Sequence, residues 1–102
     1  MEQVTSIIKN TVHEIFPDAQ VMLFGSRARG DFRPDSDYDI LVITSKEMIS
    51  ENKMSYRTNI RKNLLSHKIF SDILIQSKSE ISAKRRLTGH IIEKILDECV
   101  EL

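Results

Sequence analysis

The sequence predicts an α/β (α+β) fold, in which helices flank a small mixed β-sheet of about three to four strands. Three short apolar runs, at residues 21–24, 38–43 and 69–75, have the length and composition of buried strands. The segments before, between and after these runs are long enough to form helices. With 102 residues, of which 40% are hydrophobic and 29% charged, the chain is expected to form one domain over residues 1–102.

The first helix is predicted by a single apolar stripe that ends at Pro17. The first strand follows at residues 21–24, and residues 25–30 predict a tight turn that leads into a short helix. Residues 31–36, with Pro34 among them, predict a loop before the second strand. The stripe of the first helix consists of Val4, Ile7, Ile8, Val12, Ile15 and Phe16.

The second half of the chain predicts two long helices around the third strand. Thr44 or Ser45 can cap a helix that runs towards His67. After the third strand at residues 69–75, a last helix is expected from Ser79 to about Val100. Four residues of this last helix are expected to face inward: Leu87, Ile91, Ile95 and Cys99.

Composition excludes several classes of protein. Fifteen basic and fifteen acidic residues give a net charge of zero, which makes nucleic acid an unexpected direct partner. A single cysteine excludes an internal disulfide. The sequence lacks both a signal peptide and an apolar run long enough to span a membrane, so we expect a cytoplasmic protein without a membrane partner.

Asp37 and Asp39 stand at the start of the second predicted strand. Because side chains alternate along a strand, the two carboxylates are expected on the same face, with Cα atoms about 6–7 Å apart. Two carboxylates at this spacing can share one or two hard cations such as Mg²⁺. The competing interpretation of an isolated Asp-x-Asp pattern is a turn at Asp37 and a solvated Asp39.

The turn after the first strand carries a second signal. Gly25 lets the backbone approach a phosphate closely, and the helix that opens at Ser26 presents free N–H groups to phosphate oxygens. Ser26 adds a hydroxyl donor, and Arg27 and Arg29 can reach a polyphosphate. A Gly-Ser pair alone is common in loops. A strand, Gly-Ser, a helix and an Asp-x-Asp pattern in this order form a much rarer combination.

Asp72 is a charged residue inside the third apolar run. Burial of a carboxylate in such a strand is costly unless the group is paired or binds a metal. If the third strand lies beside the second, Asp72 joins Asp37 and Asp39. The alternative is an edge strand on which Asp72 is simply exposed.

These residues resemble the motifs of the nucleotidyltransferase superfamily of DNA polymerase beta. That pattern is a hydrophobic residue before Gly-Gly or Gly-Ser, a spacer, and then Asp-hydrophobic-Asp/Glu-hydrophobic. Phe24-Gly25-Ser26 and residues 37–40 match it. The form of residues 25–30 in a short chain resembles the minimal nucleotidyltransferase (MNT) subgroup, whose members typically act as antitoxins of HEPN-domain ribonuclease toxins. The resemblance implies that Asp37, Asp39 and Asp72 hold metal and that Ser26 lies near the β- and γ-phosphates.

The resemblance therefore implies transfer of a nucleoside monophosphate from an NTP, with ATP as the expected substrate and two Mg²⁺ ions as cofactors. Asp72 is the candidate to accept the proton of the attacking hydroxyl. Because the chain offers no second lobe for an acceptor, a tyrosine of a HEPN toxin is the expected acceptor. Two alternatives stay open: an antitoxin that neutralises its partner by contact alone, and transfer to a small molecule or RNA bound by a separate subunit.

Overall fold

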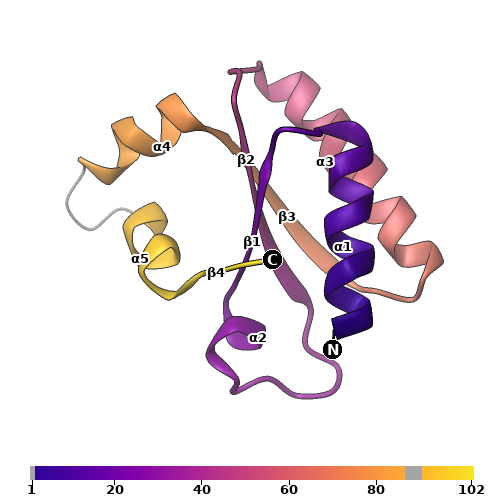
Figure 1. Ribbon diagram of the computed structural model, residues 1–102. Coiled ribbons are helices and arrows are strands. Elements are labelled where there is room, and N and C mark those ends of the chain that lie inside the picture. Colours follow the sequence, from indigo (N-terminus) through magenta and orange to yellow (C-terminus); the bar gives the residue numbers. More distant parts are fainter. Residues whose placement is uncertain (1, 87–90) are drawn as a thin grey trace.

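The computed structural model describes residues 2–86 and 91–102 and confirms the predicted mixed fold (Figure 1). The sheet has the order β3-β2-β1-β4; β2 and β3 are parallel, and β1 is antiparallel to both β2 and β4. No described helix is long and apolar enough to cross a membrane. The elements are α1 (Glu2–Ile15), β1 (Gln20–Phe24), α2 (Ser26–Arg29), β2 (Tyr38–Thr44), α3 (Ser50–Ser66), β3 (Ser71–Ser77), α4 (Lys78–Arg85), α5 (Ile91–Glu98) and β4 (Val100–Glu101).

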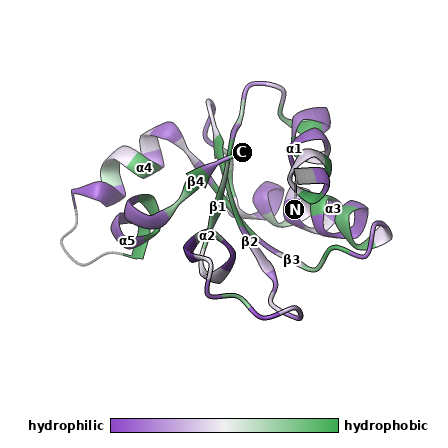
Figure 2. Cartoon of the chain, turned by 60° about the horizontal axis from the view of Figure 1, so that its bottom comes forward, coloured by the Kyte–Doolittle hydropathy of each residue, from purple (hydrophilic) through white to green (hydrophobic). Residues whose placement is uncertain are grey.

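Helices cover both faces of the sheet. Figure 1 shows α1 and α3 on one side and α4 and α5 on the other, and Figure 2 shows hydrophobic strands between these layers. Alternation along β2 explains the arrangement, because Ile40 and Val42 pack towards α1 and α3 whereas Leu41 and Ile43 pack towards α4 and α5. The apolar stripe predicted for the first helix faces the first of these cores, with its members buried or partly buried.

Two predicted boundaries were wrong. The middle helix begins at Ser50, after Ile49 as N-cap without a side-chain cap, and not at Thr44 or Ser45. The third strand begins at Ser71 instead of residue 69. Its late start has a local cause: the N–H of Ile69 donates to the Leu64 carbonyl, so the chain remains tied to the end of α3 there.

The predicted last helix is two helices within the described residues, α4 and α5, and a short strand follows them. Ser77 and Glu80 form a capping box that starts α4. Ile92, not Ile91, is buried in α5: Ile91 is 66% exposed and Ile92 is 1% exposed. The prediction that Leu87 faces inward lies outside the described residues. Ile95 is buried as predicted, and Cys99 is partly exposed.

Ser71, the first residue of β3, is 8% exposed, and its hydroxyl is the one buried side-chain oxygen without a hydrogen-bond partner in the described residues. A buried hydroxyl without a partner destabilises the folded state. Ser71→Ala is therefore expected to raise the free energy of unfolding by about 1 kcal/mol. Urea denaturation measures the change, with Ser45→Ala, at an exposed position, as the control. A Ser71→Ala protein that is less stable than the parent would show that the hydroxyl is satisfied.

Candidate active site

The sheet brings Phe24, Asp39 and Asp72 into a row across three adjacent strands, and Gly25 directly follows Phe24. Phe24 of β1 pairs with Asp39 of β2, and Asp39 pairs with Asp72 of β3. Neighbouring strands are about 4.8 Å apart, so these positions lie side by side at one end of the sheet. β3 is an edge strand and Asp72 is exposed, yet Asp72 still lies next to Asp39. Asp72 is therefore exposed on an edge strand, as one interpretation had it, and adjacent to Asp39, as the other had it.

Gly25 packs directly against the Asp39 carboxylate. The backbone of Gly25 has φ 73° and ψ −154°, a region that is essentially restricted to glycine. A Cβ atom at this position would lie 3.1 Å from Asp39 Cγ and would collide with Asp39 Oδ2. The turn after β1 and the carboxylate on β2 therefore fit together only because residue 25 has no side chain.

The pKa of Asp39 is affected by the neighbouring carboxylates. Burial raises the pKa of Asp39 above its ordinary value, and the negative charges of Asp72 and Asp37 raise it further. Arg29 opposes this shift in the pKa of Asp39, and Glu98 adds to it. The charged form of Asp39 is thus less favourable than that of a free carboxylate, and positive charge brought to the site would offset this.

Asp37 lies in the loop before β2 and not in the strand, which begins at Tyr38. This loop is held by Arg27, whose guanidinium lies between the rings of Phe32 and Tyr38, 4.2 Å and 4.4 Å from their centroids. Arg27 Nη2 also donates to the carbonyl oxygen of Ser36 at 2.9 Å. In this arrangement Arg27 supports the loop that carries Asp37. A contact between Arg27 and phosphate stays a prediction, and it would require the guanidinium to leave these partners.

The turn at α2 offers polar groups beside the carboxylates. Gly25 is the N-cap and makes no side-chain cap, so Ser26 is not needed as a cap. The Ser26 hydroxyl makes no hydrogen bond within residues 2–86 and 91–102. The first N–H groups of a helix lack intrahelical partners. The Ser26 hydroxyl and the first N–H groups within α2 are thus available to an anion.

Glu98, at the end of α5, also belongs to this site, and sequence analysis missed it. One of its oxygens accepts from the Gly25 N–H at 3.3 Å, and both accept from Arg29 Nη1 at 3.3 Å. Arg29 also forms an ion pair with Asp31 at 3.3 Å. The Glu98 carboxylate therefore occupies the Gly25 N–H and the Arg29 guanidinium, which could otherwise bind an anion. Glu98 is 73 positions from Gly25, so no local pattern could have predicted this contact.

Comparison with known proteins defines the family of the chain. The family profile described as "Nucleotidyltransferase domain" matches residues 5–102, and the chain belongs to this family. A solved structure described as that of a candidate minimal nucleotidyltransferase is similar over 99% of this chain and 94% of its own, with 23% identity and a TM-score of 0.64. A candidate nucleotidyltransferase from Sulfolobus solfataricus is similar over 98% of this chain and 82% of its own, with 28% identity and a TM-score of 0.51. No curated protein matches the chain.

The predicted fold and family are thus confirmed: the chain has the minimal nucleotidyltransferase fold. The family implies an NTP substrate and divalent metal. The carboxylates of Asp37, Asp39 and Asp72 are hard oxygen donors of the kind that Mg²⁺ prefers, and a cation would relieve the repulsion that raises the pKa of Asp39. Their chemistry therefore fits the ion. Among the described residues, no group of three or more His, Cys, Asp or Glu side chains stands in ligating positions.

Proposed function

We propose that this protein transfers AMP from ATP to a tyrosine hydroxyl of a HEPN-domain toxin and thereby acts as its antitoxin. One observation carries the proposal: Asp39 lies beside Asp72 in register and directly against the turn at Gly25. An acidic group that attracts cations and a turn that can bind phosphate are thus adjacent, as nucleotidyl transfer requires. The antitoxin role rests on the resemblance of residues 25–30 to the minimal subgroup, and the fold shared with a candidate minimal nucleotidyltransferase is consistent with it.

Each residue then has a role in the proposed transfer. Ser26 and the backbone of α2 would hold the β- and γ-phosphates, and Asp37 and Asp39, with Asp72, would hold two Mg²⁺ ions. Bound Mg²⁺ supplies the positive charge that stabilises the attacking oxygen and the leaving pyrophosphate. Asp72 accepts the proton of the tyrosine hydroxyl. A bond forms between this oxygen and the α-phosphorus, the bond to the bridging oxygen breaks, and pyrophosphate leaves.

Ser26→Ala is expected to weaken ATP binding without changing the fold. A hydrogen bond to a charged group contributes about 1.5–3 kcal/mol, so the Kd of ATP should rise about tenfold or more. The far-UV circular dichroism spectrum should stay unchanged, because Gly25 rather than Ser26 caps α2. Calorimetric titration with ATP measures the effect. A matching fall in melting temperature would instead assign the hydroxyl a structural role.

Glu98→Gln is expected to tighten ATP binding. The substitution removes a negative charge from the donors that phosphate would use while keeping the length of the side chain. Two unit charges about 4 Å apart interact by about 1 kcal/mol even with the screening of bulk water, so the Kd of ATP should fall about fivefold or more. Glu93→Gln, at an exposed position of the same helix, is the matched control and should leave the Kd unchanged. Weaker ATP binding by Glu98→Gln would show that Glu98 supports the bound nucleotide.

The acceptor is tested with the product of the neighbouring gene. Purified protein, ATP, Mg²⁺ and that product are mixed, and the intact mass of the product is measured. The proposal expects an increase of one or more AMP units that is lost with Asp39→Asn. Neutralisation of the partner without a mass change, and equally by Asp39→Asn, would establish binding without catalysis. Transfer of AMP to a small molecule or RNA, with the partner mass unchanged, would establish the remaining alternative.

A further inference from the structure

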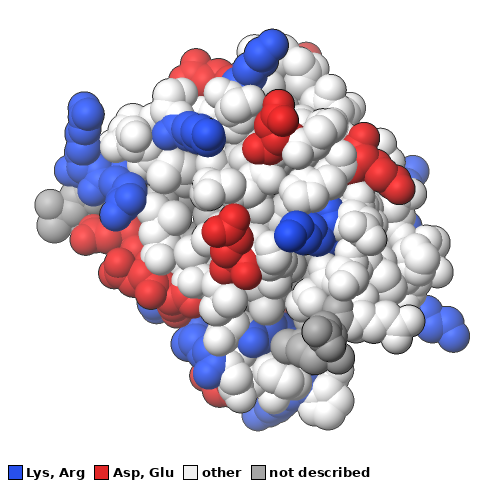
Figure 3. Space-filling model, in the orientation of Figure 1, with Lys and Arg blue, Asp and Glu red and all other residues white. Residues whose placement is uncertain are grey.

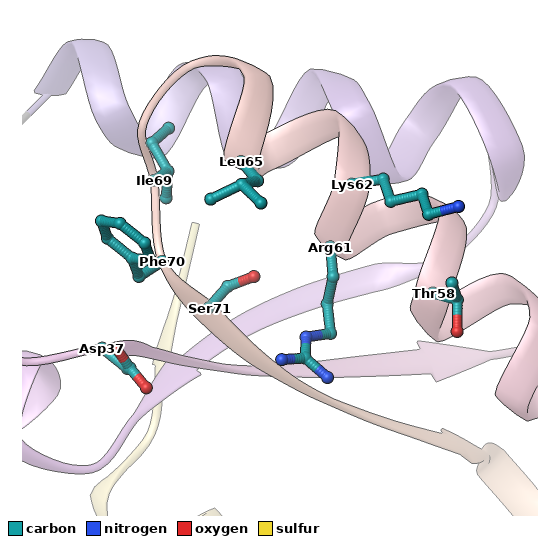
Figure 4. A pocket seen from close by; sticks show the side chains of 8 residues that line it. All are labelled: Asp37, Thr58, Arg61, Lys62, Leu65, Ile69, Phe70 and Ser71. Carbon is teal, nitrogen blue, oxygen red and sulfur yellow. The ribbon is translucent and has the colours of Figure 1, made fainter.

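A pocket of about 320 Å³ lies between α3 and the start of β3, next to the candidate active site (Figure 4). Leu65 and Phe70 supply an apolar wall, Arg61 and Lys62 of α3 supply two cations, and Asp37 lies at its border with the active site. Figure 4 also shows the Ser71 hydroxyl directed into the space between β3 and α3.

Two features indicate that this pocket is a binding site and not a packing defect. Leu65 and Phe70 are 52% and 62% exposed, which is unusual for large apolar side chains that lie together. Ser71 is nine-tenths buried, and its hydroxyl lacks a partner in the described residues. Native proteins seldom leave such a group unsatisfied, and a bound ligand would supply the missing hydrogen bond.

The cations of the pocket are free. Within residues 2–86 and 91–102, neither Arg61 nor Lys62 forms an ion pair or a hydrogen bond. Lys53, on the same helix, is by contrast bound to Glu80 at 2.6 Å. The pocket therefore complements a ligand that presents an apolar group, a hydrogen-bonding group and negative charge at the same time.

The position of the pocket relates it to the acceptor. The turn that would hold the leaving phosphates follows β1, whereas the pocket lies beyond β2, along the edge strand β3. In an in-line transfer the acceptor approaches from the side opposite to the leaving group. Ser71 and Asp72 face opposite sides of β3, so a segment anchored in the pocket would pass the start of this edge strand to reach the carboxylates.

We propose that the pocket anchors an acidic segment of the acceptor protein, next to the residue that receives AMP. This inference rests on the proposed function, because it takes the acceptor to be a protein. RNA is a less suitable occupant, since the chain has a net charge of zero whereas nucleic-acid binders are usually basic. On the face drawn in Figure 3, moreover, Lys and Arg side chains are scattered among acidic and uncharged residues and do not form a track for a polyanion.

The test measures binding without ATP or metal, so that it does not depend on catalysis. Three fluorescein-labelled probes are titrated with the full chain: a hexapeptide of four glutamates around tyrosine and isoleucine, its lysine counterpart, and a hexa-adenylate RNA. Fluorescence anisotropy should show tighter binding of the acidic peptide than of the other two. Arg61→Glu/Lys62→Glu should weaken this binding about tenfold or more. The matched control, Arg85→Glu/Arg86→Glu, makes the same change in net charge at exposed positions at and after the end of α4. It should change the affinity for the acidic peptide less than about twofold.

Ser71→Ala gives a second, independent readout. It should weaken binding of the acidic peptide while the melting temperature stays the same or rises. Equal binding by the parent protein and Arg61→Glu/Lys62→Glu, equal losses in both charge-reversed pairs, or preference for the RNA would overturn the proposal. Peptide binding that follows the expected pattern, with no AMP transfer to the partner, would instead retain the pocket and reject the proposed function.

Discussion

Asp39→Asn is expected to reduce nucleotide transfer at least about 100-fold, because it removes a charge from the centre of the carboxylate group and loses several kcal/mol of stabilisation at the reacting phosphate. Asp39 is the residue that contacts Gly25 and pairs with Asp72. Transfer of AMP to the partner over time, followed by mass spectrometry at saturating ATP, measures the loss.

The same substitution is expected to stabilise the metal-free protein. The pKa of Asp39 is raised in the folded state, first by burial and then by Asp72 and Asp37. The folded state therefore binds a proton more tightly than the unfolded chain, so ionised Asp39 destabilises the fold at neutral pH and this penalty disappears as pH falls through the folded-state pKa. Asn carries no charge at any of these pH values. The melting temperature of Asp39→Asn should exceed that of the parent at pH 7 and approach it in acid.

Asp35→Asn is the matched control, since Asp35 is an exposed residue of the loop before β2. It should change neither the transfer rate nor the melting temperature. Near-parental transfer by Asp39→Asn would remove Asp39 from the reaction. Addition of Mg²⁺ or Mn²⁺ should raise the melting temperature of the parent but not that of Asp37→Asn/Asp39→Asn.

Gly25→Ala is expected to have the second large effect. Its backbone conformation costs a residue with a side chain about 1–3 kcal/mol, and the new methyl group would also displace the Asp39 carboxylate. The free energy of unfolding should therefore fall by about 2 kcal/mol or more, and transfer should be lost together with it. Urea denaturation and the transfer assay measure the two effects.

Gly30→Ala distinguishes the cost of a positive φ from the cost of a steric clash with Asp39. Gly30 also has a positive φ, 87°, but a Cβ atom there would have no atom within 4 Å. Only the conformational cost of about 1–2 kcal/mol is expected at Gly30, with transfer preserved. If the two variants behave alike, the contact between Gly25 and Asp39 has no functional importance.

The local pattern around Asp39 could be predicted from the sequence because it depends on neighbours in the chain. Alternation along residues 38–43 determines which side chains enter each core, and Gly25 directly follows an apolar strand. The approach of Asp72 depends on parallel pairing between β2 and β3, which the sequence offered only as a possibility. In the structure β2 and β3 are parallel neighbours, and Asp39 lies opposite Asp72.

Other features depend on contacts that have no local signature. Glu98 reaches Gly25 from the end of α5, and Arg27 contacts both the ring of Phe32 in the following loop and the ring of Tyr38 at the start of β2. The strand β4 has only two residues, too few to show alternation. The exposed Phe70 was assigned to a buried strand because hydrophobicity alone does not distinguish a core residue from the wall of a pocket.

The most direct test of nucleotidyl transfer compares two labelled substrates. ATP carries a radioactive label either at the α-phosphorus or at the γ-phosphorus, and each is incubated with the protein, Mg²⁺ and the partner. Label is expected on the partner from α-labelled ATP alone, and no label is expected when Asp39→Asn replaces the parent protein. Label from γ-labelled ATP would show phosphoryl transfer instead, and α-label that persists with Asp39→Asn would contradict the assignment of the site.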